Sequence, residues 1–144
     1  MNNAIDSYIK EQFGVKEVDI KTYSPLTLAY IGDCIFDLVI RSVVVGRGNT
    51  RPNELHKKTC GIVKATTQAK MIEALENDLT EEEADIYRRG RNAKSVSTAK
   101  NASVGDYRKA TGYEALIGYL YLLDRMDRVV WLIKKGMDNL DITL

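Results

Sequence analysis

Apolar residues recur every three or four positions along most of the chain, which is the spacing of one buried helix face. Only two prolines and ten glycines interrupt this pattern. The sequence therefore predicts an all-α fold of about six to seven helices, in a single domain that spans residues 1–144. The expected helices cover approximately residues 3–13, 25–45, 52–76, 80–94, 106–124 and 126–139.

Local signals mark two of the helix starts. Ser24 is a suitable N-cap, and Pro25 fits the first turn of the helix that follows it. Thr80 with Glu83 three residues later is the pattern of a capping box. Residues 95–105, SVSTAKNASVG, are small and polar without a period, which predicts a flexible loop.

The length of the chain and its lack of targeting signals predict a cytoplasmic domain rather than an exported or membrane protein. The 144 residues suffice for one hydrophobic core. The N-terminus, MNNAIDSYIKEQFG, lacks the basic and apolar regions of a signal peptide, and no stretch is apolar enough to cross a bilayer. Cys34 and Cys60 lie in apolar segments, so we expect buried free thiols in a reducing compartment.

Charge is sorted along the chain although the formal net charge is only +1. Residues 73–85 contain seven acids and no base, whereas residues 88–109 contain seven bases and a single acid, Asp106. Such sorting is typical of a protein with one face built for a polyanion, and a merely solvated charged surface is the alternative. The bases are Arg88, Arg89, Arg91, Lys94, Lys100, Arg108 and Lys109.

Two acids lie within strongly apolar helical segments. Asp33 belongs to TLAYIGDCIFDLVIR, and Glu114 belongs to TGYEALIGYLYLL. An unpaired carboxylate is costly in such surroundings. Gly32 precedes Asp33 and Gly118 lies one turn from Glu114, and a glycine inside a helix needs a local reason such as the close approach of a second helix. We expect the two helices to cross at these glycines, with the two carboxylates facing each other in a sheltered cleft.

Facing carboxylates repel, so one takes up a proton unless a cation lies between them. Mg²⁺ suits such a pair because it accepts one or two carboxylates, keeps several waters and can activate one of them. The alternative is that each acid pairs with an arginine, Asp33 with Arg41 or Arg125. Asp37, one turn after Asp33, is either a further ligand or a polar neighbour at the rim. The basic stretch favours a phosphodiester substrate, and its lack of interleaved aromatic residues favours double-stranded RNA.

Four segments resemble a known family. LAYIGDCIFDLVIR is similar to the ribonuclease III signature, and TGYEALIGYLYLLD is similar to the second acidic motif of that family. PNELHKKTCGIVKATTQA and RRGRNAKS resemble Mini-ribonuclease III, the short bacterial subfamily that has a catalytic domain and no double-stranded-RNA-binding domain. The resemblance implies a helical homodimer that cuts both strands of duplex RNA through Mg²⁺-activated water, leaving 5′-phosphate and 3′-hydroxyl ends.

The resemblance also assigns roles to residues. Asp33 and Glu114 match residues that are both catalytic and metal ligands in the family. Larger family members carry two further acids where this chain has Ala29 and Thr111, a departure expected of the short form. The subfamily contacts RNA through the loop between the fourth and fifth expected helices. The RNA-binding candidates are therefore Arg88, Arg89, Arg91, Asn92, Lys94, Lys100, Arg108 and Lys109.

The subfamily matures the ends of the 23S ribosomal RNA precursor on the pre-50S particle, assisted by a large-subunit ribosomal protein. The resemblance implies the same partners here, and no membrane. A non-catalytic double-stranded-RNA-binding or ribosome-assembly module on the same fold is a second hypothesis, motivated by the two replaced acids. A helical interaction protein with salt-bridged acids is a third.

Overall fold

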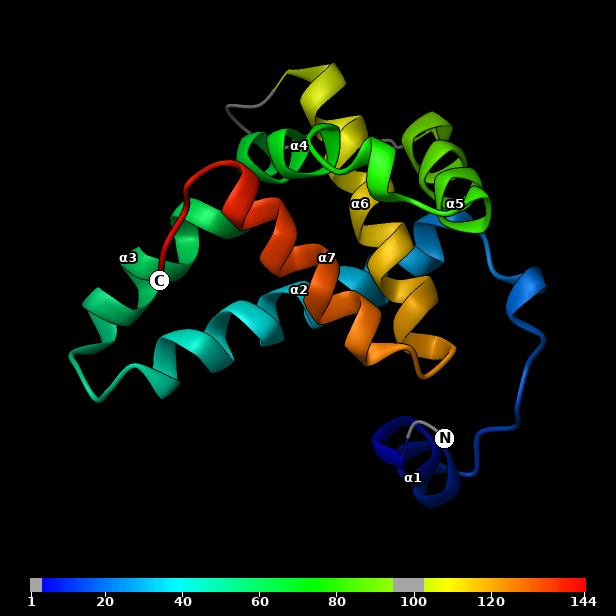
Figure 1. Ribbon diagram of the computed structural model, residues 1–144. Helices are drawn as coiled ribbons and strands as arrows, with labels where there is room; N and C mark the ends of the chain where they lie inside the picture. The colour runs from blue at the N-terminus through cyan, green and yellow to red at the C-terminus, as the bar shows by residue number, and fades with distance from the viewer. Residues whose placement is uncertain (1–3, 95–102) are drawn as a thin grey trace.

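The computed structural model describes residues 4–94 and 103–144, and in these residues helices are the only regular secondary structure (Figure 1). The predicted all-α fold is thus confirmed. The described α-helices are α1 (Ala4–Phe13), α2 (Pro25–Gly46), α3 (Pro52–Val63), α4 (Ala65–Glu73), α5 (Glu81–Asn92), α6 (Val104–Leu122) and α7 (Met126–Asn139). None of these helices combines the length and the apolar character needed to cross a membrane.

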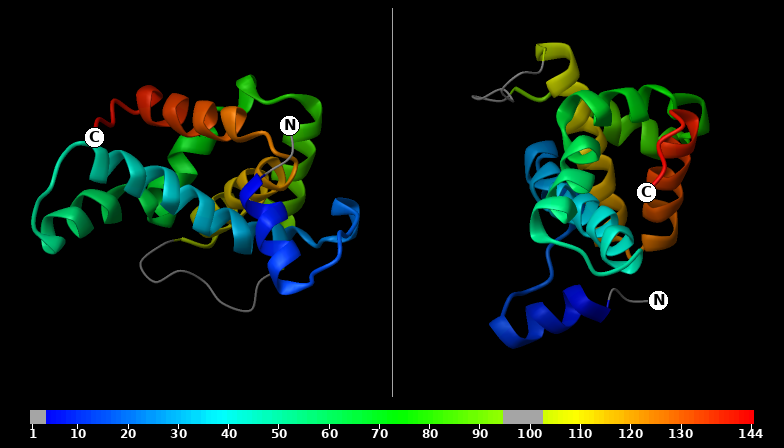
Figure 2. Two further views of the ribbon diagram at one scale, coloured as in Figure 1. Left: turned by 90° about the horizontal axis from the view of Figure 1, so that it is seen from below. Right: turned by 90° about the vertical axis from the view of Figure 1, so that its left-hand side faces the viewer.

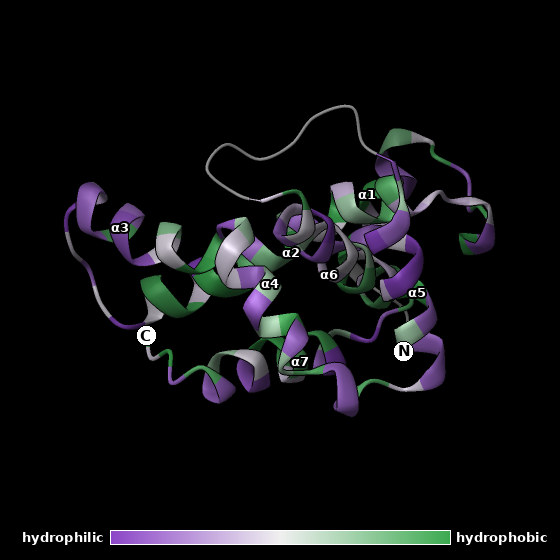
Figure 3. Ribbon diagram, turned by 90° about the horizontal axis from the view of Figure 1, so that it is seen from above, coloured by the Kyte–Doolittle hydropathy of each residue, from purple (hydrophilic) through white to green (hydrophobic). Residues whose placement is uncertain are grey.

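Helix α6 is the centre of the fold, and α2, α4, α5 and α7 pack against it (Figures 1 and 2). Its Tyr113, Leu116 and Leu120 side chains are completely buried. The Tyr113 ring meets Phe36 of α2 edge to face, with 5.6 Å between the ring centroids. The outer turns of α3 and α5 are strongly hydrophilic (Figure 3), as expected for helices that bury only one face.

The predicted helix starts are confirmed. The Ser24 hydroxyl accepts a hydrogen bond from the Thr27 N–H at 3.2 Å. At the start of α5, Thr80 and Glu83 form the complete capping box. Glu83 is buried and also accepts two hydrogen bonds from Arg128 of α7, at 2.8 and 2.9 Å. The capping residue therefore also links α5 to α7.

The single helix expected over residues 52–76 is wrong. The chain turns at Lys64, which has an extended backbone conformation, so that α3 and α4 are separate helices. Ile62 of α3 and Ile72 of α4 are both buried, so each helix packs an apolar face of its own.

The expectation of buried thiols is also wrong, because Cys34 and Cys60 are both exposed. Cys34 lies on a face of α2 that no other described helix covers, beside the exposed side chains of Tyr30 and Leu38. Cys60 lies on the outer face of α3, where its sulfur is 3.1 Å from Nε2 of His56. An apolar sequence context did not reveal which face of each helix is covered.

Candidate active site

Helices α2 and α6 cross in backbone contact at the two glycines. A Cβ atom on Gly32 would lie 1.7 Å from the carbonyl oxygen of Glu114, and one on Gly118 would lie 2.0 Å from the carbonyl oxygen of Leu28. No side chain larger than hydrogen fits at either position. The predicted crossing at Gly32 and Gly118 is therefore confirmed.

The crossing brings Asp33 and Glu114 together, as the sequence predicts. Both carboxylates line an open pocket of about 560 Å³ between α2 and the first half of α6. Asp33 is exposed at its mouth and Glu114 is half-buried in its wall. Ala29 and Thr111 line the same pocket. These are the two positions at which the family resemblance implies acids in the larger members, and both face the pocket that holds Asp33 and Glu114.

The environment of Glu114 opposes its ionisation. Burial, together with the hydrogen bond and the charge of the neighbouring Asp33 carboxyl, raises the pKa of Glu114 to about 9. The side-chain amide of Gln68, from α4, lies beside Glu114 and acts in the opposite direction. Gln68 is almost completely buried, and its Nε2 has no hydrogen-bond partner of ordinary geometry among the described residues. The Asp33 and Glu114 carboxylates can therefore either share a proton or bind a cation between them.

The arginine alternative for Asp33 is not supported. Arg41 pairs with Asp37 at 2.6 Å, and Arg125 donates to Glu82 at 2.8 Å. Within residues 4–94 and 103–144, no three His, Cys, Asp or Glu side chains gather closely enough to hold a metal ion. The protein groups available to a metal in the pocket are therefore the two carboxylates, and Asp37 is held at the side by its arginine.

Some of the predicted RNA-binding residues are engaged by other side chains, and others are exposed without such a contact. The side chain of Arg88 pairs with Asp85, and that of Lys109 pairs with Glu73 of α4. The Arg91 guanidinium lies over the Tyr87 ring, 5.4 Å from its centroid. Lys100 lies outside the described residues. The remaining predicted side chains are exposed, and these are Arg89, Asn92, Lys94 and Arg108.

A second basic surface, around α3, was not predicted. Residues 41–70 contain seven bases and one acid, Glu54, so the same charge count that singled out residues 88–109 would have found it. All seven bases are exposed. We call this set the α3 basic surface, and its members are Arg41, Arg47, Arg51, Lys57, Lys58, Lys64 and Lys70.

Comparisons with known proteins agree with this geometry. The family model described as "Ribonuclease III domain" matches residues 26–125, which include both helices of the crossing. A Mini-ribonuclease 3 of Clostridium tetani is 44% identical over 128 residues, covering 88% of this chain and 83% of that protein. A Mini-ribonuclease 3 of Enterococcus faecalis is 46% identical over 123 residues, covering 81% of this chain and 93% of that protein.

A solved structure is similar as well. The crystal structure of protein FN1578 from Fusobacterium nucleatum superposes with a TM-score of 0.75 at 34% sequence identity. The match covers 82% of this chain and 96% of that chain.

Proposed function

The chain belongs to the ribonuclease III family, in its Mini-ribonuclease 3 group, and on that premise we propose that it is an Mg²⁺-dependent endoribonuclease that cleaves double-stranded RNA. The observation that carries the proposal is the meeting of Asp33 and Glu114 in one open pocket. Two backbone-contact glycines fix the helices that hold these carboxylates. A site made in this way presents two oxygen ligands at a fixed separation.

The donor set fits a hard divalent cation. Carboxylate oxygens are the ligands that Mg²⁺ prefers, and one or two of them commonly suffice because the ion keeps several waters. The raised pKa of Glu114 reflects burial and repulsion from Asp33, and a cation between the two groups would relieve this repulsion. Bound there, the ion would supply an activated water and offset negative charge on the scissile phosphate.

Side chains of the protein would bind the metal ion and orient the RNA. Asp33 and Glu114 would hold the ion from opposite helices, while Gln68 lies on the buried side of Glu114 and leaves the other side facing the pocket. Exposed bases at the end of α5 and the start of α6 would hold the RNA backbone. These bases are Arg89, Lys94 and Arg108.

The proposal extends to the substrate and the assembly. We expect the enzyme to mature the ends of the 23S ribosomal RNA precursor in the bacterial cytoplasm, on a pre-50S particle and with a large-subunit ribosomal protein. We expect a homodimer, which is supported by the apolar face that α2 leaves exposed. On this face Tyr30 and Leu38 are 84% and 52% exposed, although both belong to the helix that carries Asp33.

The test compares three single substitutions on long duplex RNA with Mg²⁺. We expect Asp33→Asn and Glu114→Gln to abolish cleavage while the fold and RNA binding persist. Asp37→Asn is the matched control, because Asp37 lies one turn from Asp33 on the same helix but pairs with Arg41. Mapping precursor 23S ends in cells that carry Asp33→Asn tests the substrate.

Three results would count against the proposal. Mg²⁺-dependent cleavage by either pocket variant would contradict the assigned roles. Loss of cleavage in the Asp37 control would indicate that any charge change on this face is harmful. Intact duplex after incubation with excess parent protein would favour a non-catalytic RNA-binding module.

A further inference from the structure

Most members of the α3 basic surface form no ion pair with the acids of the described residues. Among the described residues, the ion pairs engage Arg41 of this set and none of Arg51, Lys57, Lys58 and Lys64. Arg47 donates from Nε to the main-chain oxygen of Leu144 at 3.0 Å. Like charges gathered on and around one short helix repel each other, so they favour a site that an anion occupies.

The predicted basic stretch also contains paired bases. There, Arg88 and Lys109 are already neutralised by Asp85 and Glu73. Among the described residues, four cations without an acidic partner lie on α3 and its flanking turns, as many as remain in residues 88–109. A second surface that attracts a polyanion is therefore found at α3.

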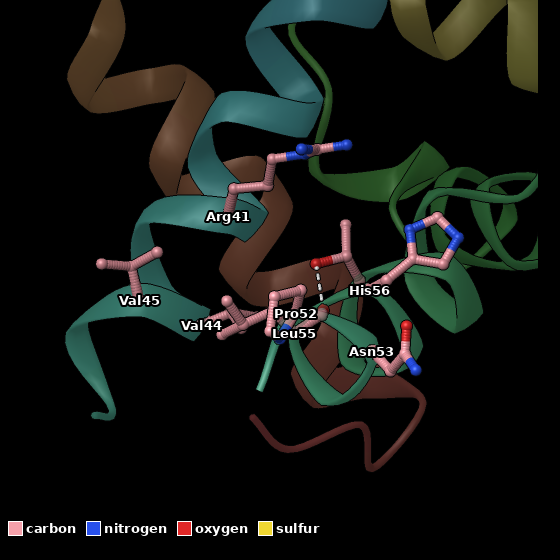
Figure 4. A pocket seen from close by; sticks show the side chains of 8 residues that line it. Arg41, Val44, Val45, Pro52, Asn53, Leu55 and His56 are labelled. Carbon is pink, nitrogen blue, oxygen red and sulfur yellow. Dashed lines mark hydrogen bonds between the residues drawn. The ribbon is translucent and has the colours of Figure 1, made fainter. Parts of the chain in front are cut away.

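The surface is also hollowed. A pocket of about 440 Å³ lies between the last turns of α2 and the first turns of α3. Figure 4 shows Arg41 of α2 and Asn53 and His56 of α3 around it, with the apolar Val44 and Leu55 between them. Arginine, asparagine and histidine side chains all offer N–H donors, which suit phosphate and ribose hydroxyl oxygens.

This surface is continuous with the active site along α2. Asp33, Asp37 and Arg41 follow one another at intervals of four residues, so they lie along one face of the helix. Arg41 lies about 12 Å from Asp33 along the helix axis, at 1.5 Å per residue. A duplex cut at Asp33 can therefore reach α3 without leaving this face of the molecule.

We propose that the α3 basic surface is a second binding site for the backbone of the double-stranded RNA substrate, at a distance from the cut. The inference rests on the proposed function, since it names where else the same substrate is held. Contacts of this kind involve phosphates and 2′-hydroxyls and carry little sequence information. They would anchor the duplex through electrostatic attraction that weakens as salt is added.

The test uses two double charge reversals of equal size. Lys57→Glu with Lys58→Glu alters the α3 basic surface, and Lys16→Glu with Lys21→Glu makes the same change in exposed lysines at the N-terminal side. Each is combined with Asp33→Asn, and binding to long duplex RNA is measured from about 50 to 200 mM salt. Circular dichroism verifies the fold.

We expect the α3 reversal to weaken binding about 10-fold or more at the higher salt, and to reduce the slope of log affinity against log salt by about two. With Asp33 restored, kcat/KM should fall in parallel. The control reversal should leave both quantities close to those of the parent.

Two outcomes would overturn the inference alone. The α3 reversal could bind and cleave like the control, or it could retain full duplex binding while losing association with ribosomal particles, which would assign the surface to a protein partner. If the parent protein neither binds nor cleaves duplex RNA, the proposed function fails first. The two failures are therefore distinguishable.

Discussion

The sharpest structural expectation concerns Gly32, because its replacement by alanine places a methyl group inside the α2–α6 contact. The new Cβ would lie 1.7 Å from the Glu114 carbonyl oxygen and 2.8 Å from the Gly118 nitrogen. Both neighbours are backbone atoms in helices and cannot rotate away. Carbon atoms pack best at about 3.5–4.0 Å, so the helices would have to separate by roughly 1.5–2 Å.

We expect Gly32→Ala to lower the free energy of unfolding by about 3 kcal/mol or more, at the upper end of overpacking costs. The better helix propensity of alanine offsets at most about 1 kcal/mol of this loss. Cleavage should also be lost, because separating the helices moves Glu114 away from Asp33. Urea titration followed by circular dichroism gives the first quantity.

Gly61→Ala is the matched control. Gly61 lies inside α3, and a Cβ there would meet nothing within 4 Å. We expect this variant to gain up to about 1 kcal/mol, as exposed glycines in helices do on replacement. A Gly32→Ala protein within about 1 kcal/mol of the parent would refute the backbone-contact argument, given typical overpacking costs.

Three further expectations follow from buried polar groups. Burial and Asp33 raise the pKa of Glu114 from 4.5 to about 9, so between these pH values the folded protein holds a proton that the unfolded chain releases. The free energy of unfolding of the metal-free protein should therefore fall as the pH rises from 4.5 to 9, by at most about 1.4 kcal/mol per pH unit. Urea titrations in EDTA should show this fall for the parent protein and not for Glu114→Gln. Arg128→Met should cost about 3–5 kcal/mol near neutral pH by leaving the Glu83 carboxylate buried and unpaired. Burial raises the pKa of Glu83 and the Arg128 hydrogen bonds lower it, so without Arg128 the buried carboxylate takes up a proton more readily. The destabilisation measured by urea titration should therefore be smaller at acid pH, where Glu83 of the variant is neutral. Gln68→Leu should keep or raise stability, by up to about 1–2 kcal/mol, since it removes a buried amide whose Nε2 has no hydrogen bond of ordinary geometry. Cleavage by this variant should require a higher Mg²⁺ concentration in titrations, and an unchanged requirement would exclude a role of Gln68 in orienting Glu114.

The sequence was sufficient to predict the central part of the fold. Glycines beside two acids in apolar helices pointed to a close crossing, because glycine there is costly without a neighbouring backbone. The crossing and the meeting of Asp33 with Glu114 were both found. The assignment of catalytic and RNA-binding roles stays a prediction that the experiments above address.

Tertiary packing determines three features that the sequence did not predict: the helix break at Lys64, the position of Gln68 and the pairing of two predicted RNA-binding bases. The break at Lys64 has no proline to announce it, and Ile62 before it and Ile72 after it are both buried. Gln68 gave no signal as a residue near the site, since only the turn into α4 brings it beside Glu114. The ion pairing of Arg88 and Lys109 likewise depends on contacts that a charge count along the chain does not contain.

The break at Lys64 has a consequence for local unfolding. Helix α3 buries only Thr59 and Ile62, whereas α6 buries most of its length. A helix with so few buried contacts can open alone, while α6 opens only with the whole domain. Hydrogen exchange should therefore be fast at α3 amides and slowest at the middle of α6. The α2–α6 crossing would keep its geometry while α3 unfolds and refolds locally, so a rigid catalytic centre can coexist with a flexible helix at the edge of the fold.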